Sequence, residues 1–85
     1  MTQSFRSKIA VDQNICHGKP HIIGTRIMVH QVLDLLATDA TIEEIIEEDF
    51  PDLTRDDILA CIAYANKLVR DEEIEIFTEA EAEVA

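Results

Sequence analysis

Cysteine and histidine side chains near the N-terminus raise the question of a metal site. Cys16, His17 and His21 are all potential zinc ligands. Structural zinc sites, however, use four ligands in paired spacing, and here His30 and Cys61 would have to arrive from separate helices. We therefore expect no metal and no cofactor, and we expect both thiols to be free.

Two cations lie beside the only two glycines of the chain, in the stretches Gly18-Lys19-Pro20 and Gly24-Thr25-Arg26. Lys19 and Arg26 are candidates for contact with a phosphate or with a partner's carboxylate, and Thr25 lies next to them. The alternative is that the segment serves only as a turn, because backbone torsion explains both glycines. We take Lys19, Thr25 and Arg26 as DNA- or partner-binding candidates.

Thr54 and Arg55 open the last predicted helix, at the position where a helix-turn-helix protein meets DNA. The alternative is a plain helix cap followed by a solvated arginine. Asp56 and Asp57 come next; they favour the helix dipole but repel phosphates at close range. Thr54 and Arg55 remain binding candidates, with the DNA role left open.

The charge is strongly uneven along the chain. Eighteen acidic and seven basic residues give a net charge of −11, distributed as +3 over residues 1–30, −7 over residues 31–70 and −7 over residues 71–85. Non-specific nucleic-acid binding depends on cations that release phosphate counterions. The excess of acidic residues therefore disfavours such binding. It favours a basic protein partner. The clustered carboxylates of residues 43–49 lack a nucleophile or base nearby, so we expect no enzyme.

The elements that would position these residues follow from hydrophobic periodicity and capping signals. Short β-branched segments on either side of the glycines predict a small hairpin or extended arm. Helices are predicted over about 29–38, 41–49 and 54–71, the second with a Thr41/Glu44 capping box and Phe50 in the core. The prediction is a mainly α fold, a three-helix helix-turn-helix core that is winged-helix-like or homeodomain-like, with a short N-terminal β-hairpin or arm.

Chain length and composition limit the organisation further. Eighty-five residues form one small domain, which is too small to enclose a substrate cavity easily. We expect a folded unit over residues 1–71 and an acidic tail over residues 72–85 that stays disordered without a partner. No run reaches the roughly 18 apolar residues of a membrane span, and the N-terminus lacks a secretory signal. We expect a cytoplasmic protein with no membrane contact.

Several short motifs are similar to a known family. Ile15-Cys16-His17-Gly18-Lys19-Pro20, Ile23-Gly24-Thr25-Arg26-Ile27-Met28-Val29 and Asp49-Phe50-Pro51-Asp52-Leu53-Thr54 resemble the domain of unknown function family 433 over about residues 8–70. The resemblance implies a small DNA-binding fold that acts as a Vap-type antitoxin and is often encoded beside a PIN-like ribonuclease toxin. Ile23 departs from the pattern, because arginine is common there.

Together these observations predict an antitoxin that neutralises a basic PIN-like toxin and autoregulates its operon by binding operator DNA, assisted by the toxin. We expect a homodimer or a hetero-oligomer with the toxin. The alternative is a stand-alone helix-turn-helix transcriptional regulator.

Overall fold

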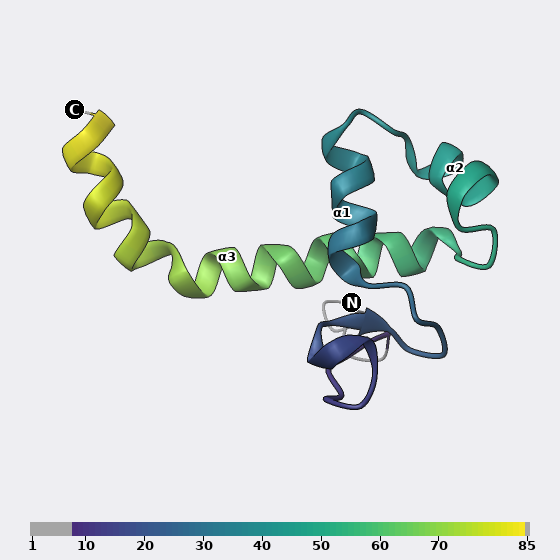
Figure 1. Ribbon diagram of the computed structural model, residues 1–85. Helices are drawn as coiled ribbons and strands as arrows, with labels where there is room; N and C mark the ends of the chain where they lie inside the picture. The colour runs from purple at the N-terminus through teal and green to yellow at the C-terminus, as the bar shows by residue number, and fades with distance from the viewer. Residues whose placement is uncertain (1–7, 85) are drawn as a thin grey trace.

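The computed structural model describes residues 8–84, with side chains described for residues 8–71. The fold is mainly helical, with three helices and a two-stranded antiparallel hairpin near the N-terminus (Figure 1). The three helical segments are α1 (Val29–Ala37), α2 (Ile42–Glu44) continued by the π-helix η3 (Ile45–Asp49), and α3 (Arg55–Val84). Their starting points agree with the predicted helices to within one residue.

The hairpin pairs β1 (Ile9–Ala10) with β2 (His21–Ile22). Ile9 lies opposite Ile22 and Ala10 opposite His21, and a further bridge joins His21 to Met28. The chain reverses between the strands through the short 3-10 turn η2 (Cys16–Gly18), where Cys16 and His17 both have positive φ. The reversal was predicted at the glycines, and it begins two residues before Gly18.

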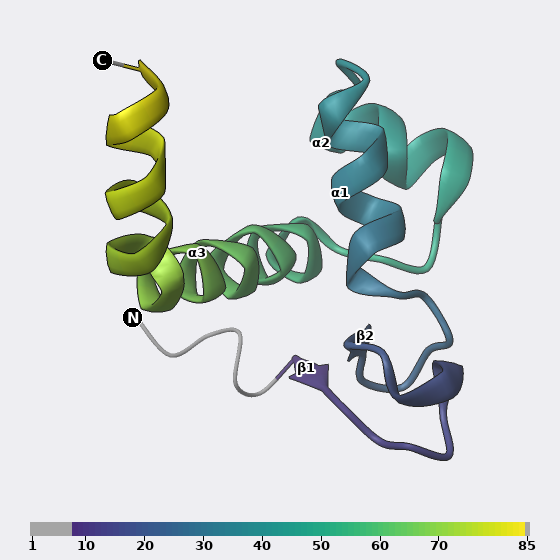
Figure 2. The same ribbon diagram turned by 60° about the vertical axis from the view of Figure 1, so that its left-hand side comes forward.

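In Figure 1, helix α1 crosses in front of α3 and the hairpin lies below the crossing; Figure 2 also shows the hairpin below α1. Val29 and Val32 are the buried residues of α1. The helix ends where the Thr38 hydroxyl donates to the Leu35 carbonyl at 2.8 Å, and Asp39 follows with a φ of +79°. Aspartate tolerates this left-handed conformation better than most residues, so Asp39 can turn the chain out of α1.

The second helical segment begins with the predicted capping box. The Glu44 N–H donates to the Thr41 hydroxyl at 3.0 Å, and the Thr41 N–H donates to Glu44 Oε1 at 2.9 Å. The segment then widens into a π-helix, which closes with a 2.8 Å bond from the Phe50 N–H to the Ile45 carbonyl. Ile45 is fully buried. Phe50, which was predicted in the core, is only partly buried against it.

Helix α3 supplies the largest share of the core through Ile58, Ala60 and Cys61, which are fully buried. They pack with buried residues from β1, β2, α1, η3 and the turn before α3, which are Ile9, Ile22, Val29, Val32, Ile45 and Leu53. The helix ends at Val84, later than predicted. The prediction of a disordered tail falls on side chains outside the described part of the chain, so it stays a prediction. Among the described residues, no helix is long and apolar enough to cross a membrane.

Candidate functional site

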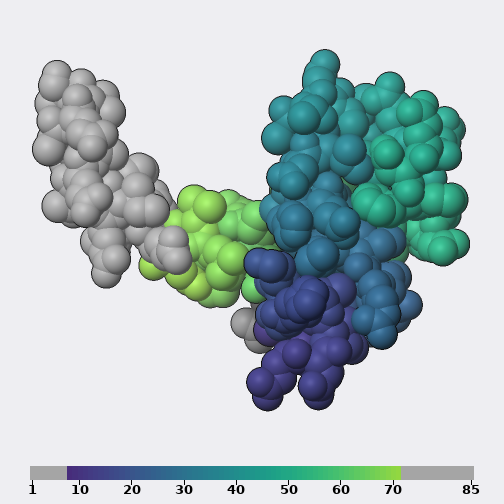
Figure 3. Space-filling model, viewed as in Figure 1, coloured from purple at the N-terminus to yellow at the C-terminus, as the bar shows by residue number. Residues whose placement is uncertain are grey.

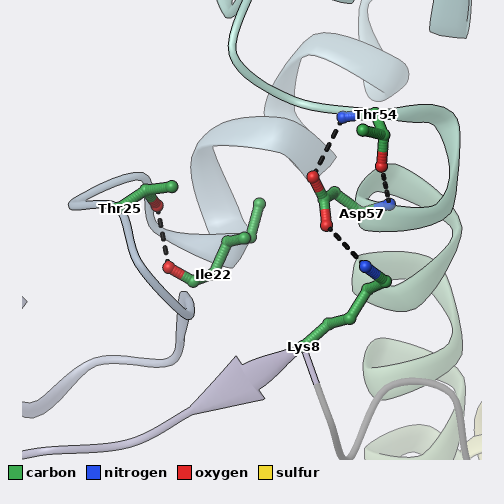
Figure 4. A network of polar contacts seen from close by, with 5 residues as sticks. All are labelled: Lys8, Ile22, Thr25, Thr54 and Asp57. Atoms are coloured by element: carbon green, nitrogen blue, oxygen red, sulfur yellow. Dashed lines mark hydrogen bonds and ion pairs between the residues drawn. The ribbon is translucent and has the colours of Figure 1, made fainter.

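The loop after β2 is held in shape by the Thr25 side chain. Its hydroxyl donates to the Ile22 carbonyl at 2.8 Å (Figure 4) and accepts from the Ile27 N–H at 2.9 Å. Gly24 beside it has a φ of +86°, a conformation that a residue with a side chain adopts only with strain. Thr25 therefore positions the loop through bonds within it.

Arg26 lies at the rim of a shallow pocket of about 350 Å³. The other lining residues are Ile15, His21, Gly24 and Thr25. The Arg26 side chain is exposed and makes no ion pair with any residue of the described part. His21 is 3% exposed, and its Nδ1 has no hydrogen-bond partner among the described residues. The pocket thus combines a solvent-facing cation with a buried imidazole.

Lys19 lies at a different place, on the rim of an apolar groove of about 390 Å³. The groove runs between the loop before β2, the first turns of α1 and the middle of α3. Its lining residues are Lys19, Pro20, Val29, His30, Leu33, Tyr64, Ala65 and Leu68. None of these lines the Arg26 pocket. Lys19 and Arg26 were predicted to form one contact surface. In the structure they line two different pockets.

At the start of α3, Thr54 and Asp57 cap each other's backbone. The Thr54 N–H donates to Asp57 Oδ2 at 2.9 Å, and the Asp57 N–H donates to the Thr54 hydroxyl at 3.2 Å (Figure 4). Asp57 also lies 3.2 Å from Lys8 Nζ. Partial burial would raise the pKa of Asp57, but the hydrogen bonds from Thr54 and the Lys8 ammonium together lower it below 3.8. Thr54 is therefore engaged in capping.

Arg55 is paired with a carboxylate. Its guanidinium lies 3.1 Å from Glu43 Oε2, and both side chains are exposed. Exposed pairs of this kind contribute little to stability, but they place a negative charge beside the cation. With Asp56 and Asp57 in the same helical turn, the start of α3 offers a phosphate less net positive charge than the Arg26 loop does.

The acidic residues form a surface of their own. Glu43, Glu44, Glu47, Glu48 and Asp49 are all exposed on the segment formed by α2 and η3. Glu43 bonds to Arg55 and Glu44 caps Thr41, whereas Glu47, Glu48 and Asp49 have no ion-pair partner among the described residues. We call these last three residues the acidic surface. Within the described part of the chain, no three His, Cys, Asp or Glu side chains gather as metal ligands would.

Sequence reasoning missed the apolar groove and the Lys8–Asp57 pair. The groove joins residues of three segments, so no local pattern contains it. The sequence held one signal of the groove, which is the pair Leu68 and Val69 near the end of the predicted third helix. Both are exposed, and they continue the apolar stripe of that helix beyond α1.

Comparison with known proteins gives one match. No curated protein matches the chain, and no solved structure matches it. A family model described as protein of unknown function (DUF433) matches residues 9–65, which include both loop cations, the hairpin, α1 and the capped start of α3. The chain belongs to the DUF433 family.

Proposed function

We propose that this protein is an antitoxin, which binds and silences a PIN-like ribonuclease and, together with it, binds its operator DNA as a helix-turn-helix protein. The observation that carries the proposal is the separation of charge. The acidic surface of Glu47, Glu48 and Asp49 lies on η3, while Arg26 lies on the loop after β2. Opposite charges on separate elements suit two partners of opposite charge.

The acidic surface is the proposed contact for a basic toxin. Its three carboxylates are exposed and have no ion-pair partner among the described residues. A chain with a net charge of −11 attracts a basic protein from a distance, which speeds association at low salt. Glu43 and Glu44 are occupied within the fold, so they contribute less to this contact.

The Arg26 loop is the proposed contact for operator DNA. Arginine binds phosphate oxygens through two parallel N–H groups, and Arg26 has no described carboxylate to compete for them. The chain as a whole repels DNA, so we expect weak binding by the free protein. A bound basic toxin would offset that repulsion, and two antitoxins could then occupy half-sites about 34–36 Å apart.

The second candidate is a stand-alone transcriptional regulator. The layout of α2 and η3, a short turn through Leu53 and then α3 favours it, because helix-turn-helix proteins present the start of the second helix to DNA. The pairing of Arg55 with Glu43 weighs against this helix as the main phosphate contact. The two candidates differ in whether a ribonuclease is bound.

The test is to look for a PIN-like ribonuclease reading frame that adjoins this gene and to produce the two proteins together. We expect the two to purify as a complex in which RNA cleavage is blocked. Glu47→Lys/Glu48→Lys should relieve the inhibition at least about tenfold at low salt. The control, Asp12→Lys/Asp34→Lys, changes the net charge equally but lies on other elements, and it should still inhibit.

Failure of the wild-type chain to bind or inhibit the ribonuclease would contradict the antitoxin proposal. Sequence-specific DNA binding by the chain without a toxin would then favour the regulator. Equal inhibition by both double variants would assign the toxin contact to another surface.

A further inference from the structure

Helix α3 carries a line of solvent-exposed apolar side chains beside the residues that face the core. Leu59, Ile62 and Val69 are 42%, 39% and 62% exposed, although each is a large apolar residue. Together with Asn66, which is also exposed, they follow one another at steps of three, four and three residues. This spacing places all four on one line along about 15 Å of helix, and it is typical of a helix that packs against a second helix. We call these four residues the α3 line.

The α3 line is separate from the apolar groove beside Lys19. The α3 residues of the groove are Tyr64, Ala65 and Leu68, and none of them belongs to the line. Successive residues of a helix are turned by about 100°, so Leu68 and Val69 face different directions. Figure 3 shows the described end of α3, in light green, extending past α1. The helix therefore has a second apolar surface besides the groove.

Opposite charges lie at the two ends of one flank of this line. Asp56, Ala63 and Arg70 are spaced by seven residues, so they share one side of the helix. Asp56 and Arg70 are both exposed, and neither makes an ion pair with a described residue. The small Ala63 lies midway between them. A second copy of the same flank, running in the opposite direction, would present an arginine to the aspartate and an aspartate to the arginine.

We propose that two copies of this chain form a dimer in which their α3 helices pack side by side, in opposite directions, along the α3 line. Leu59 of each copy then lies level with Val69 of the other, and Ile62 lies level with Asn66. The same surface is used on both copies, so the contact closes at two. It includes neither the acidic surface on η3 nor the Arg26 loop. It therefore goes beyond the proposed function and does not depend on it.

The charges on the flank select the direction of the pairing. In the antiparallel arrangement, Asp56 of each copy lies beside Arg70 of the other, which gives two equivalent ion pairs. In a parallel arrangement these two residues would be about 21 Å apart, at 1.5 Å per residue, and no ion pair would form. Asn66 is the single polar member of the line, and a polar residue at such a position lowers the affinity of a helix pair. The contact is short, so we expect a dissociation constant in the micromolar range.

The first test measures the oligomeric state of the full-length chain by sedimentation equilibrium. We expect a wild-type dimer, and we expect Leu59→Glu to raise its dissociation constant at least about tenfold. The matched control is Leu68→Glu, because Leu68 is 45% exposed on the same helix but lies in the groove. Circular dichroism checks that both variants keep their helices. A wild type that stays monomeric up to about 100 μM, or an equal effect of the two variants, would overturn the proposal.

The second test determines the direction of the helices by exchanging charges. Asp56→Lys alone and Arg70→Asp alone each place like charges opposite one another, so each variant should dimerise at least about tenfold more weakly than the wild type. A mixture of the two should form a heterodimer, because lysine then faces aspartate and arginine faces aspartate. That heterodimer should be at least about tenfold tighter than either homodimer.

The control for the exchange replaces Arg70→Asp by Lys67→Asp, which changes the net charge equally but lies outside the flank. The Lys67→Asp chain should dimerise like the wild type, and mixing it with the Asp56→Lys chain should give no heterodimer tighter than its own homodimer. Absence of a heterodimer between the Asp56→Lys and Arg70→Asp chains would overturn the antiparallel arrangement. An equal gain with Lys67→Asp would also overturn it, because net charge would then explain the attraction.

Discussion

The Lys8 ammonium lies 3.2 Å from the Asp57 carboxylate and so joins the residue before β1 to the first turn of α3 (Figure 4). The side chains are 33% and 15% exposed, so water screens this pair less than it screens the other ion pairs of the described part. Asp57 also closes the capping box with Thr54. One carboxylate therefore fixes both the start of the longest helix and the position of the hairpin against it.

Removal of the Lys8 charge should destabilise the fold in a pH-dependent way. We expect Lys8→Met to lower the free energy of unfolding by about 1–2 kcal/mol at pH 7. The pKa of Asp57 is lowered in the folded state, so the pair stabilises the protein above pH 3.8, the ordinary value, and its contribution disappears as the pH falls below that. Urea unfolding at several pH values measures the difference between variant and wild type.

The control for this experiment is Lys67→Met. Lys67 pairs with Asp71 at 3.2 Å on the exposed side of α3, where both side chains are about half exposed. Its loss should cost no more than about 0.5 kcal/mol. A similar cost for both variants, or a Lys8→Met effect unchanged down to pH 3, would show that Lys8 acts only through its hydrocarbon chain.

The two cysteines should differ sharply in reactivity. Cys61 is fully buried in the core, and burial together with the nearby Asp57 charge raises its pKa to about 12. Cys16 is only partly buried, and its thiol donates to the Arg26 carbonyl at 3.4 Å. In the native protein we expect iodoacetamide to modify Cys16 at least about tenfold faster than Cys61. Mass spectrometry of the labelled peptides checks this, and equal rates would show that the core opens locally.

Ile45 should contribute more than Phe50 to the free energy of unfolding. Ile45 is fully buried, and Ile45→Ala should cost about 3–4 kcal/mol. Phe50 is partly buried against the core, so Phe50→Ala should cost about 2 kcal/mol, less than a buried phenylalanine would. Thermal and chemical unfolding of both variants compare the two. A larger cost for Phe50→Ala would place the centre of the core at the end of η3.

Local sequence signals predicted the parts of this fold that depend on neighbouring residues. The predicted Thr41–Glu44 capping box is confirmed, and the alternative of a helix cap at Thr54 is found as its bonds with Asp57; both pairs join residues three apart. The Lys8–Asp57 pair joins residues 49 positions apart, and no local pattern marks it.

The candidate site was harder to predict than the fold. The residue types of Lys19 and Arg26 were visible in the sequence, but their assignment to separate pockets depends on how the loops pack against α1 and α3. Ile42, Ile46 and Phe50 follow a regular helical stripe and are partly buried, whereas Ile45, the first residue of the π-helix, is fully buried. A widened turn of this kind has no signature in the hydrophobic period.

If the Arg26 loop is the DNA contact, substitutions of Arg26, Arg55 and Lys67 should weaken operator binding in that order. In the complex with the toxin, Arg26→Ala should weaken operator binding by about 1–3 kcal/mol and lower the salt slope by about one per contacting copy. Arg55→Ala should have a smaller effect, because Glu43 already pairs with Arg55. Lys67→Ala removes a cation that is paired with Asp71, so it serves as the matched control and should bind like the wild type.

We propose that this chain binds a ribonuclease toxin and then, through Arg26, operator DNA. The most direct measurement is a gel shift on operator DNA across a salt series, with the free chain and with the toxin complex, for the wild type, Arg26→Ala and Lys67→Ala. We expect weak binding by the free chain, binding at least about tenfold tighter by the complex, and loss of that gain in Arg26→Ala alone. Tight binding by the free chain that neither the toxin nor Arg26→Ala changes would contradict the account.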